Sequence, residues 1–352
     1  MQARVVFKAV SINAAWRACL LAMVVICMAL MPGVAHAQTL ERIRERGFLV
    51  CASVSPIAGF AQQDGEGRWT GFDIDICRAI AAAALGDPNL IEYRPLRGNA
   101  RYALLQTGDI DVVVRNAPWT FQRDVDYGAS YVTPIFYDGQ AFMVAQDLAI
   151  VSAYELDGNS ICISDDPELL GRLREFFFLN QTEYEEVLYE DLADLAVAYR
   201  AGLCEVVSAS GRDLHALRRD LPDPGAHRIL PERISKEALA PVVASGDAQW
   251  FDIVRWTIFS LVNAEELGVT ALNLDQLTGT RTVAVRRLLG LELDFGAPLG
   301  LESDFMADVI RSVGNYGEIY ERNFGPQTGA VLLRGQNSLW INGGQLYAQP
   351  VR

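Results

Sequence analysis

One arginine and a group of carboxylates stand in predicted turns, where their side chains could hold a charged solute. Arg123 ends the segment 115–123, which follows the predicted strand 110–114. Its planar guanidinium can donate to both oxygens of a carboxylate, although a surface salt bridge to Asp124 or Asp126 is the alternative. A second turn carries acidic side chains that suit a cation or an amine, at Asp165, Asp166 and Glu168. A Ser-His-Asp order, a paired-carboxylate motif and a phosphate loop are all missing from the sequence, which favours reversible binding over catalysis.

The first 37 residues have the pattern of a secretory signal peptide. Basic residues precede an uncharged run at 18–31, and Ala35, His36 and Ala37 form a small-residue cleavage site. A membrane anchor is the alternative, but the run is shorter than the roughly 20 apolar residues that span a bilayer. We therefore predict cleavage after Ala37 and a periplasmic location for the mature chain.

Length and composition indicate a globular protein of two domains. The chain has 352 residues, of which 51% are hydrophobic, enough to fill two cores. Its formal net charge is −14 and becomes more negative when Arg4, Lys8 and Arg17 leave with the leader. Such an acidic surface repels phosphate backbones, so we expect no nucleic-acid partner. We expect a monomer.

Strands and helices alternate twice along the chain. The first run has strands at 48–53, 91–94 and 110–114 around a helix that Asp73 is expected to cap and a helix that begins near 100. The second run has strands at 161–164, 186–189 and 205–209, with helices at 167–178 and 192–201. We predict that a strand at 239–243 and a helix capped by Asp247 belong to the first domain again. This alternation favours an α/β class with two mostly parallel sheets.

Four cysteines remain after removal of the leader, and an even number in an oxidising compartment suggests two disulfides. Pairing within each domain would join Cys51 to Cys77 and Cys162 to Cys204. The other interpretation is a metal site, but zinc sites use short CxxC spacings with nearby histidines. We therefore expect no metal and no cofactor.

Six blocks in order along the chain resemble the periplasmic polar amino-acid-binding proteins of ABC transporters, and among them the general L-amino-acid-binding subgroup. The blocks are GFLVC at 47–51, WTGFDID at 69–75, GDIDV at 108–112, YDGQAFM at 137–143, QWFDIV at 249–254 and GNYGE at 314–318. The resemblance implies the type II periplasmic binding fold, in which two α/β lobes are joined by two crossover strands. We assign residues 38–142 plus 237–352 to lobe 1 and residues 143–236 to lobe 2.

The resemblance also implies a set of ligand-binding residues. Arg123 matches the arginine that binds the ligand's α-carboxylate, and Arg101 matches one that holds a side-chain carboxylate in receptors for acidic amino acids, although a helix-surface role is the alternative for Arg101. Asn116 matches the position whose carbonyl meets the ligand's ammonium group, and Thr120 belongs to the same loop. Glu168 and Ser210 complete the predicted set on the second lobe.

Three positions depart from the family pattern. Pro118 replaces the carboxylate-binding Ser or Thr and supplies neither a hydroxyl nor an amide hydrogen. The segment 165–168 carries acceptors where the family has a Gly-Thr-Thr turn, and Ser210 stands in place of the ammonium-binding Asp, with Asp213 close by. An unpaired buried charge costs several kcal/mol. Either the ligand is not an ordinary α-amino acid, or other residues of the pocket replace these donors.

We therefore expect a receptor that delivers a polar amino acid, or a related small charged solute, to an ABC permease in the inner membrane. One alternative is a sensory binding protein that docks on a different membrane partner, and another is a receptor for a non-standard amine or carboxylate. A third is an enzyme on the same fold resembling cyclohexadienyl dehydratases, with Glu168 or His215 as the proton-transfer group.

Overall fold

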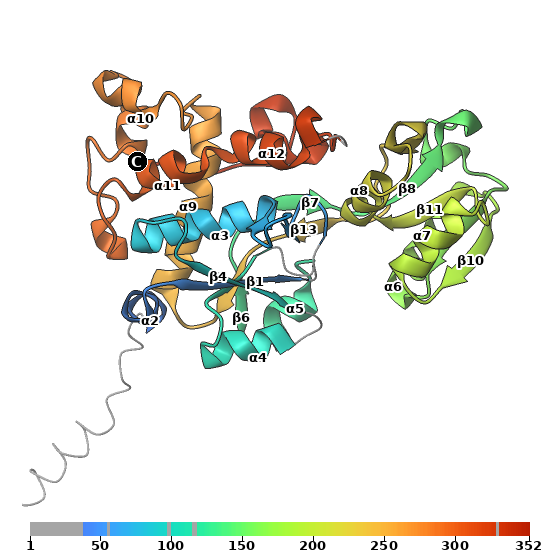
Figure 1. Cartoon of the computed structure of the whole chain (residues 1–352), viewed down its shortest axis with the longest axis horizontal. Coiled ribbons are helices and arrows are strands. Elements are labelled where there is room, and N and C mark those ends of the chain that lie inside the picture. The colour runs from blue at the N-terminus through green and yellow to red at the C-terminus, as the bar shows by residue number, and fades with distance from the viewer. Residues whose placement is uncertain (1–37, 55–56, 97–99, 115–117, 329–330) are drawn as a thin grey trace, which may run out of the picture.

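The computed structural model describes residues 38–54, 57–96, 100–114, 118–328 and 331–352. The predicted leader, its cleavage site and Asn116 lie outside these residues. The described chain forms two α/β lobes of unequal size, and the larger one contains both the first and the last segments (Figure 1). Among the described residues, no helix is both long enough and apolar enough to cross a membrane.

Lobe 1 is built on a five-stranded sheet with the order β4-β1-β5-β14-β6. Its strands are β1 Leu49–Val54, β4 Ile91–Leu96, β5 Val112–Val113, β6 Ala129–Tyr131 and β14 Val242–Ala244. β1 lies between β4 and β5 and is parallel to both, whereas β14 runs antiparallel. A further pair, β2 Gln62–Gln63 and β3 Trp69–Thr70, forms a small antiparallel ribbon.

Helices cover this sheet and enclose the larger core. They are α2 Gln38–Arg46, α3 Phe72–Leu85, α4 Ala100–Thr107, α5 Phe121–Asp126, α9 Ala248–Glu266, α10 Val283–Leu288, α11 Phe305–Val313 and α12 Tyr316–Phe324. α3 carries an unbroken run of buried alanines at 81–84 and packs against α9 and α11. On the opposite face, Tyr102 and Leu105 of α4 pack with Val113 of the sheet.

Lobe 2 is a second five-stranded sheet with the order β10-β9-β11-β8-β12. Its strands are β8 Gln140–Ala145, β9 Ser160–Ser164, β10 Glu185–Tyr189, β11 Val206–Ser210 and β12 His227–Ile229. Its helices are α6 Pro167–Asn180, α7 Leu192–Arg200 and α8 Gly211–Arg219. Leu173 and Phe177 of α6 pack in one core cluster, whereas Leu195 of α7 and Leu214 of α8 pack in another.

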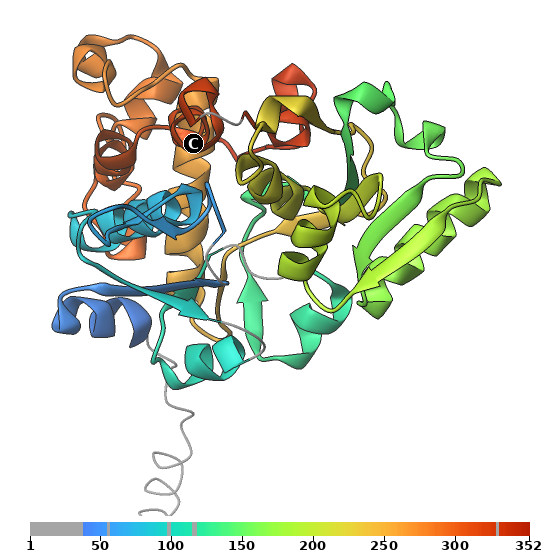
Figure 2. The ribbon, with the colours of Figure 1, turned by 45° about the vertical axis from the view of Figure 1, so that its right-hand side comes forward.

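Two short strands connect the lobes. β7 Phe136–Asp138 and β13 Glu237–Leu239 run antiparallel between the two sheets, and Asp138 is paired in register with Glu237 (Figures 1 and 2). The predicted architecture of two α/β lobes with two crossover strands is therefore confirmed. The residue boundaries at 142 and 236 stay a proposal, and β8 runs across the first of them.

Both expected disulfides are present, one in each lobe. Cys51 of β1 bonds to Cys77 of α3, and Cys162 of β9 bonds to Cys204 next to β11. Each bond therefore ties a strand to a later segment of the same lobe.

One predicted strand divides at a proline. The segment 239–243 was expected to form one strand, but β13 ends at Leu239 and β14 begins at Val242. Pro241 lies between them and has no amide hydrogen to continue a ladder. The break lets the chain leave the crossover strand and enter the sheet of lobe 1.

Candidate functional site

The parallel strands of both sheets end near the crossover strands. In open α/β sheets, ligands bind outside the carboxyl ends of the strands. In lobe 1 these ends lie at Leu96, Val54 and Val113, and the segments 97–99, 55–56 and 115–117 that follow are outside the described residues. In lobe 2 the corresponding ends are Ser164, Tyr189 and Ser210. All six predicted ligand-binding residues follow or end one of these strands.

The charges of Arg101 and Arg123 both act on Tyr131 of lobe 1. Arg101 is buried on α4, and its guanidinium carbon lies 4.9 Å from the centre of the Tyr102 ring. The Tyr102 hydroxyl is 3.1 Å from the Tyr131 hydroxyl. Burial and Tyr102 raise the pKa of Tyr131, and the positive charges of Arg123 and Arg101 act against that rise. The two predicted anion-binding groups thus act on one small region of the lobe.

The loop before α5 is attached to a crossover strand. The Trp119 amide donates to the Ala238 carbonyl at 3.0 Å, and the Trp119 ring stacks on Tyr131 with centroids 5.4 Å apart. The Thr120 hydroxyl caps α5 by accepting from the Arg123 amide. This loop is therefore attached both to β13 and to lobe 1.

Pro118 orients Arg123 through its carbonyl. Nη1 of Arg123 donates to the Pro118 oxygen at 3.1 Å, so the residue that lacks an amide hydrogen still fixes the arginine. In the described part of the chain, Arg123 forms no ion pair with Asp124 or Asp126. The surface salt bridge considered from the sequence is therefore not formed.

The acidic turn of lobe 2 is already engaged in protein contacts. Asp166 caps α6, and its Oδ1 accepts from the amides of Glu168 and Leu169 at 2.8 and 3.0 Å. Glu168 is exposed and pairs with Arg172, which also donates to Glu237 at 2.9 Å. The carboxylate of Asp166 therefore occupies the helix amides that could otherwise receive an anion.

Ser210 also has a local role. It is buried, caps α8 by accepting from the Asp213 amide, and donates its hydroxyl proton to Oδ2 of Asp213 at 2.5 Å. Asp213 is thus hydrogen-bonded to Ser210, the position at which the family pattern has an aspartate.

The crossover strands carry charged residues that the sequence analysis missed. Asp138 and Glu237 are both buried, and burial raises the pKa of each carboxyl. Arg212 lies 3.6 Å from Asp138 and 4.0 Å from Glu237. The sequence did show one acidic residue in each of these two short segments. It could not show that residues 138 and 237 pair, because the two segments are far apart in the chain and meet only in the folded protein.

His215 does not lie where a proton-transfer group would contact a solute. It is fully buried on α8, and its ring packs edge-on against Phe324 of lobe 1 at 5.9 Å. Burial and the charges of Arg218 and Arg219 lower its pKa to about 3. The imidazole is therefore neutral at physiological pH.

Comparison with known families identifies the chain. The model of the bacterial extracellular solute-binding proteins, family 3, matches residues 49–270. The chain belongs to this family. The matched region includes the complete second lobe, both crossover strands and all six predicted ligand-binding residues.

Relatives of this solute-binding protein extend over most of its length. It is 44% identical over 320 residues to the general L-amino acid-binding periplasmic protein AapJ of Rhizobium johnstonii, covering 90% of the chain and 94% of the relative. It is also 44% identical to the glutamate/glutamine/aspartate/asparagine-binding protein BztA of Rhodobacter capsulatus, covering 92% and 96%. The resemblance drawn from the six blocks is therefore confirmed.

A solved structure supports the fold. An ABC transporter periplasmic binding protein from Brucella ovis with glutathione bound matches with a TM-score of 0.80 and 40% identity. The match covers 90% of this solute-binding protein and 100% of the Brucella chain. The type II periplasmic binding fold is thus confirmed.

Proposed function

We propose that this protein is a periplasmic receptor that closes its two lobes on a small solute bearing a carboxylate and passes it to an ABC permease. The observation that carries the proposal is a chain of contacts beside crossover strand β13, which runs from Arg101 through two stacked or bonded tyrosines to the loop that holds Arg123. A guanidinium fixed by its own loop loses little freedom when it binds a carboxylate, and its fork matches both oxygens.

The ligand's anionic groups bind mainly to lobe 1. The first amides of α6 are occupied by Asp166, and the first amides of α8 are bonded to Gly139, Asp138 and Ser210. Lobe 2 therefore offers acceptors, and Asp213, which accepts from Ser210, would receive the ligand's ammonium group. This division suits a solute with an anionic end and a cationic end.

Two ligand classes follow from the relatives. AapJ and BztA are named as receptors for amino acids, and the Brucella protein holds glutathione. Acidic amino acids and glutathione each carry two carboxylates and one ammonium group, and two arginines on lobe 1 can bind two carboxylates. We propose acidic amino acids and glutathione as the first ligands to test.

The remaining assignments complete this proposal. The leader is cleaved after Ala37, and the mature monomer works in the periplasm without a nucleic-acid partner or catalysis. The burial of His215 supports a binding role, because a group that never meets the solute cannot transfer a proton to it.

A thermal-shift screen over amino acids, glutathione, amines and small carboxylates tests the proposal. A ligand present at a hundred times its Kd adds roughly 2.7 kcal/mol of apparent stability. The increase should disappear in Arg123→Gln and shrink in Arg101→Gln. It should persist in Arg255→Gln, which removes a charge from an exposed ion pair on α9. An unchanged increase in Arg123→Gln would refute the proposed carboxylate anchor.

A further inference from the structure

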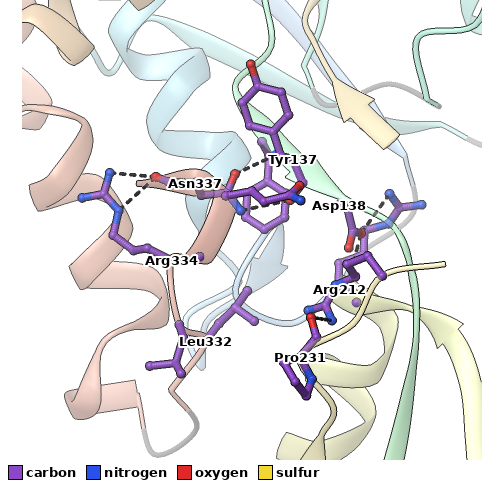
Figure 3. Close-up of a pocket in the computed structure, with 13 residues that line it drawn as sticks. Tyr137, Asp138, Arg212, Pro231, Leu332, Arg334 and Asn337 are labelled. Atoms are coloured by element: carbon purple, nitrogen blue, oxygen red, sulfur yellow. Dashed lines mark hydrogen bonds and ion pairs between the residues drawn. The ribbon is translucent and has the colours of Figure 1, made fainter. Parts of the chain in front are cut away.

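A small cavity lies at the junction of the two lobes, apart from the predicted ligand-binding residues. Its volume is about 150 Å³. Its walls come from β7, from the start of α8, from the segment before β13 and from the C-terminal segment of lobe 1 (Figure 3). None of the predicted ligand-binding residues that the structure describes lines it. The polar and charged lining residues include Asp138, Arg212, Arg233, Arg334, Gln336 and Asn337.

Two of the three lining arginines are balanced by carboxylates. Arg334 donates to both oxygens of Glu265. Arg212 lies within ion-pair distance of Asp138, which is itself buried. These two positive charges are therefore compensated by the protein.

Arg233 is the arginine whose charge lacks a direct counterion. Its Nη1 donates to the carbonyl oxygens of Leu230, Pro231 and Glu232, and it forms no ion pair within the described parts of the chain. Burial lowers its pKa, as expected for a guanidinium moved from water without a carboxylate partner. Its Nε and Nη2 lie close to Gly211, since a Cβ at that position would be 3.3 and 3.4 Å from these two nitrogens.

Arg212 adds buried donors to the same region. Its Nε and Nη1 are inaccessible to solvent, and neither makes a hydrogen bond in the described chain. Its carboxylate neighbours lie 3.6 to 4.0 Å away, which is too long for hydrogen bonds. A buried donor without an acceptor costs about 1 to 3 kcal/mol.

We propose that this cavity binds a small oxyanion, of the phosphate, sulfate or carboxylate class, between Arg233 and Arg212. The cavity has room for an anion of five or fewer heavy atoms, and such an anion would pair the uncompensated guanidinium. Arginine forks bind tetrahedral and planar oxyanions through parallel hydrogen bonds. Asn337 lines the cavity on the lobe 1 side.

The site would join the two lobes. Arg233 and Arg212 belong to lobe 2 or its border, whereas Asn337 belongs to lobe 1 and bonds to both main-chain groups of Tyr137 in β7. An anion held between these walls binds best at one angle between the lobes, so its occupancy changes the free energy of closure.

Calorimetric titration of the mature protein with inorganic phosphate, without any amino acid, tests the inference independently of the proposed function. Potassium chloride at equal ionic strength is the reference. Phosphate should bind and raise the melting temperature, and Arg233→Gln should weaken binding by roughly tenfold or more because a charge-assisted pair is lost. Arg228→Gln is the matched control, because Arg228 is a half-buried arginine of β12 that bonds to the Ile150 carbonyl outside the cavity.

A second variant keeps the test decisive if Arg233→Gln does not fold. Gln336 is exposed at the cavity rim, so Gln336→Glu adds a negative charge without disturbing the ion pairs. This variant should also lose phosphate binding. The inference is overturned if the wild-type protein gives the same response to phosphate as to chloride, or if both Arg233→Gln and Gln336→Glu bind phosphate as the wild type does. Repeating the titration with sulfate and acetate separates the three anion types.

Discussion

Asp138 and Glu237 face each other across the two strands that connect the lobes. They are register partners and both are buried, and the charge of Asp138 adds to burial in raising the pKa of Glu237. Arg172, Arg212 and Arg233 surround the pair from lobe 2. The junction at which the lobes must move is therefore an ionic cluster inside the protein, where charges are costly unless they are paired.

The raised pKa of Asp138 predicts a pH dependence of stability. Burial favours the protonated carboxyl in the folded state, so the stabilising contribution of this group is complete below its unfolded pKa of 3.8 and is lost as the pH rises through the folded value. Asp138→Asn removes this titration. The stability of Asp138→Asn relative to wild type should therefore rise between pH 4 and neutrality, as measured by urea unfolding at each pH. Asp275→Asn, which removes a carboxylate from an exposed ion pair, is the control for the loss of a surface charge.

Removal of Arg172 should destabilise the protein through the charge it leaves behind. Arg172→Leu leaves Glu237 buried without its closest partner, which should lower the free energy of unfolding by about 3 to 5 kcal/mol. The double variant Arg172→Leu with Glu237→Leu should recover much of this loss, because no buried charge remains. A denaturant-unfolding cycle measures both. Additive effects of the two substitutions would contradict the coupling.

The disulfide of lobe 2 should stabilise that lobe by closing a long loop. Cys162 and Cys204 are separated by 42 residues, and a bond of this kind typically contributes about 2 to 4 kcal/mol. The double substitution of both cysteines by Ser should lower the free energy of unfolding by that amount. The same substitution at Cys51 and Cys77 provides the comparison for lobe 1. An unchanged midpoint in reducing buffer would show that neither bond matters.

Asp166 should stabilise α6 as its N-terminal cap. Asp166→Ala removes two hydrogen bonds to helix amides and should cost about 1 kcal/mol. Asp166→Thr retains a capping oxygen and removes the negative charge. We expect this second variant to bind anionic solutes more tightly, because the helix end then repels them less. Titration of both variants with the ligand found in the screen compares the two effects, and equal affinities would argue against an electrostatic role.

The sequence predicted the features that local patterns determine. The alternation of strands and helices along the chain predicted α4 at 100–107 and most strands to within a few residues. The expectation that cysteines pair within each lobe predicted both disulfides. The expected cap of α3 was wrong: Asp73 is buried inside the helix and accepts from Ser53, while Gly71 precedes the helix. A residue 20 positions away competed for that side chain, and no local pattern reveals such a contact. The ionic cluster was missed for the same reason, since its members come from four separate segments.

Each lobe has its own covalent cross-link, while the link between them consists of two strands of three residues each. When the lobes move relative to each other, we expect the change to be confined to a few backbone torsions at the junction. The packing inside each lobe should then stay nearly the same. Empty and loaded molecules should then differ in radius of gyration by X-ray scattering, while their near-ultraviolet circular dichroism, which reports aromatic packing, stays almost the same. Recognition by a membrane partner would depend on the outline of the molecule rather than on any change within a lobe.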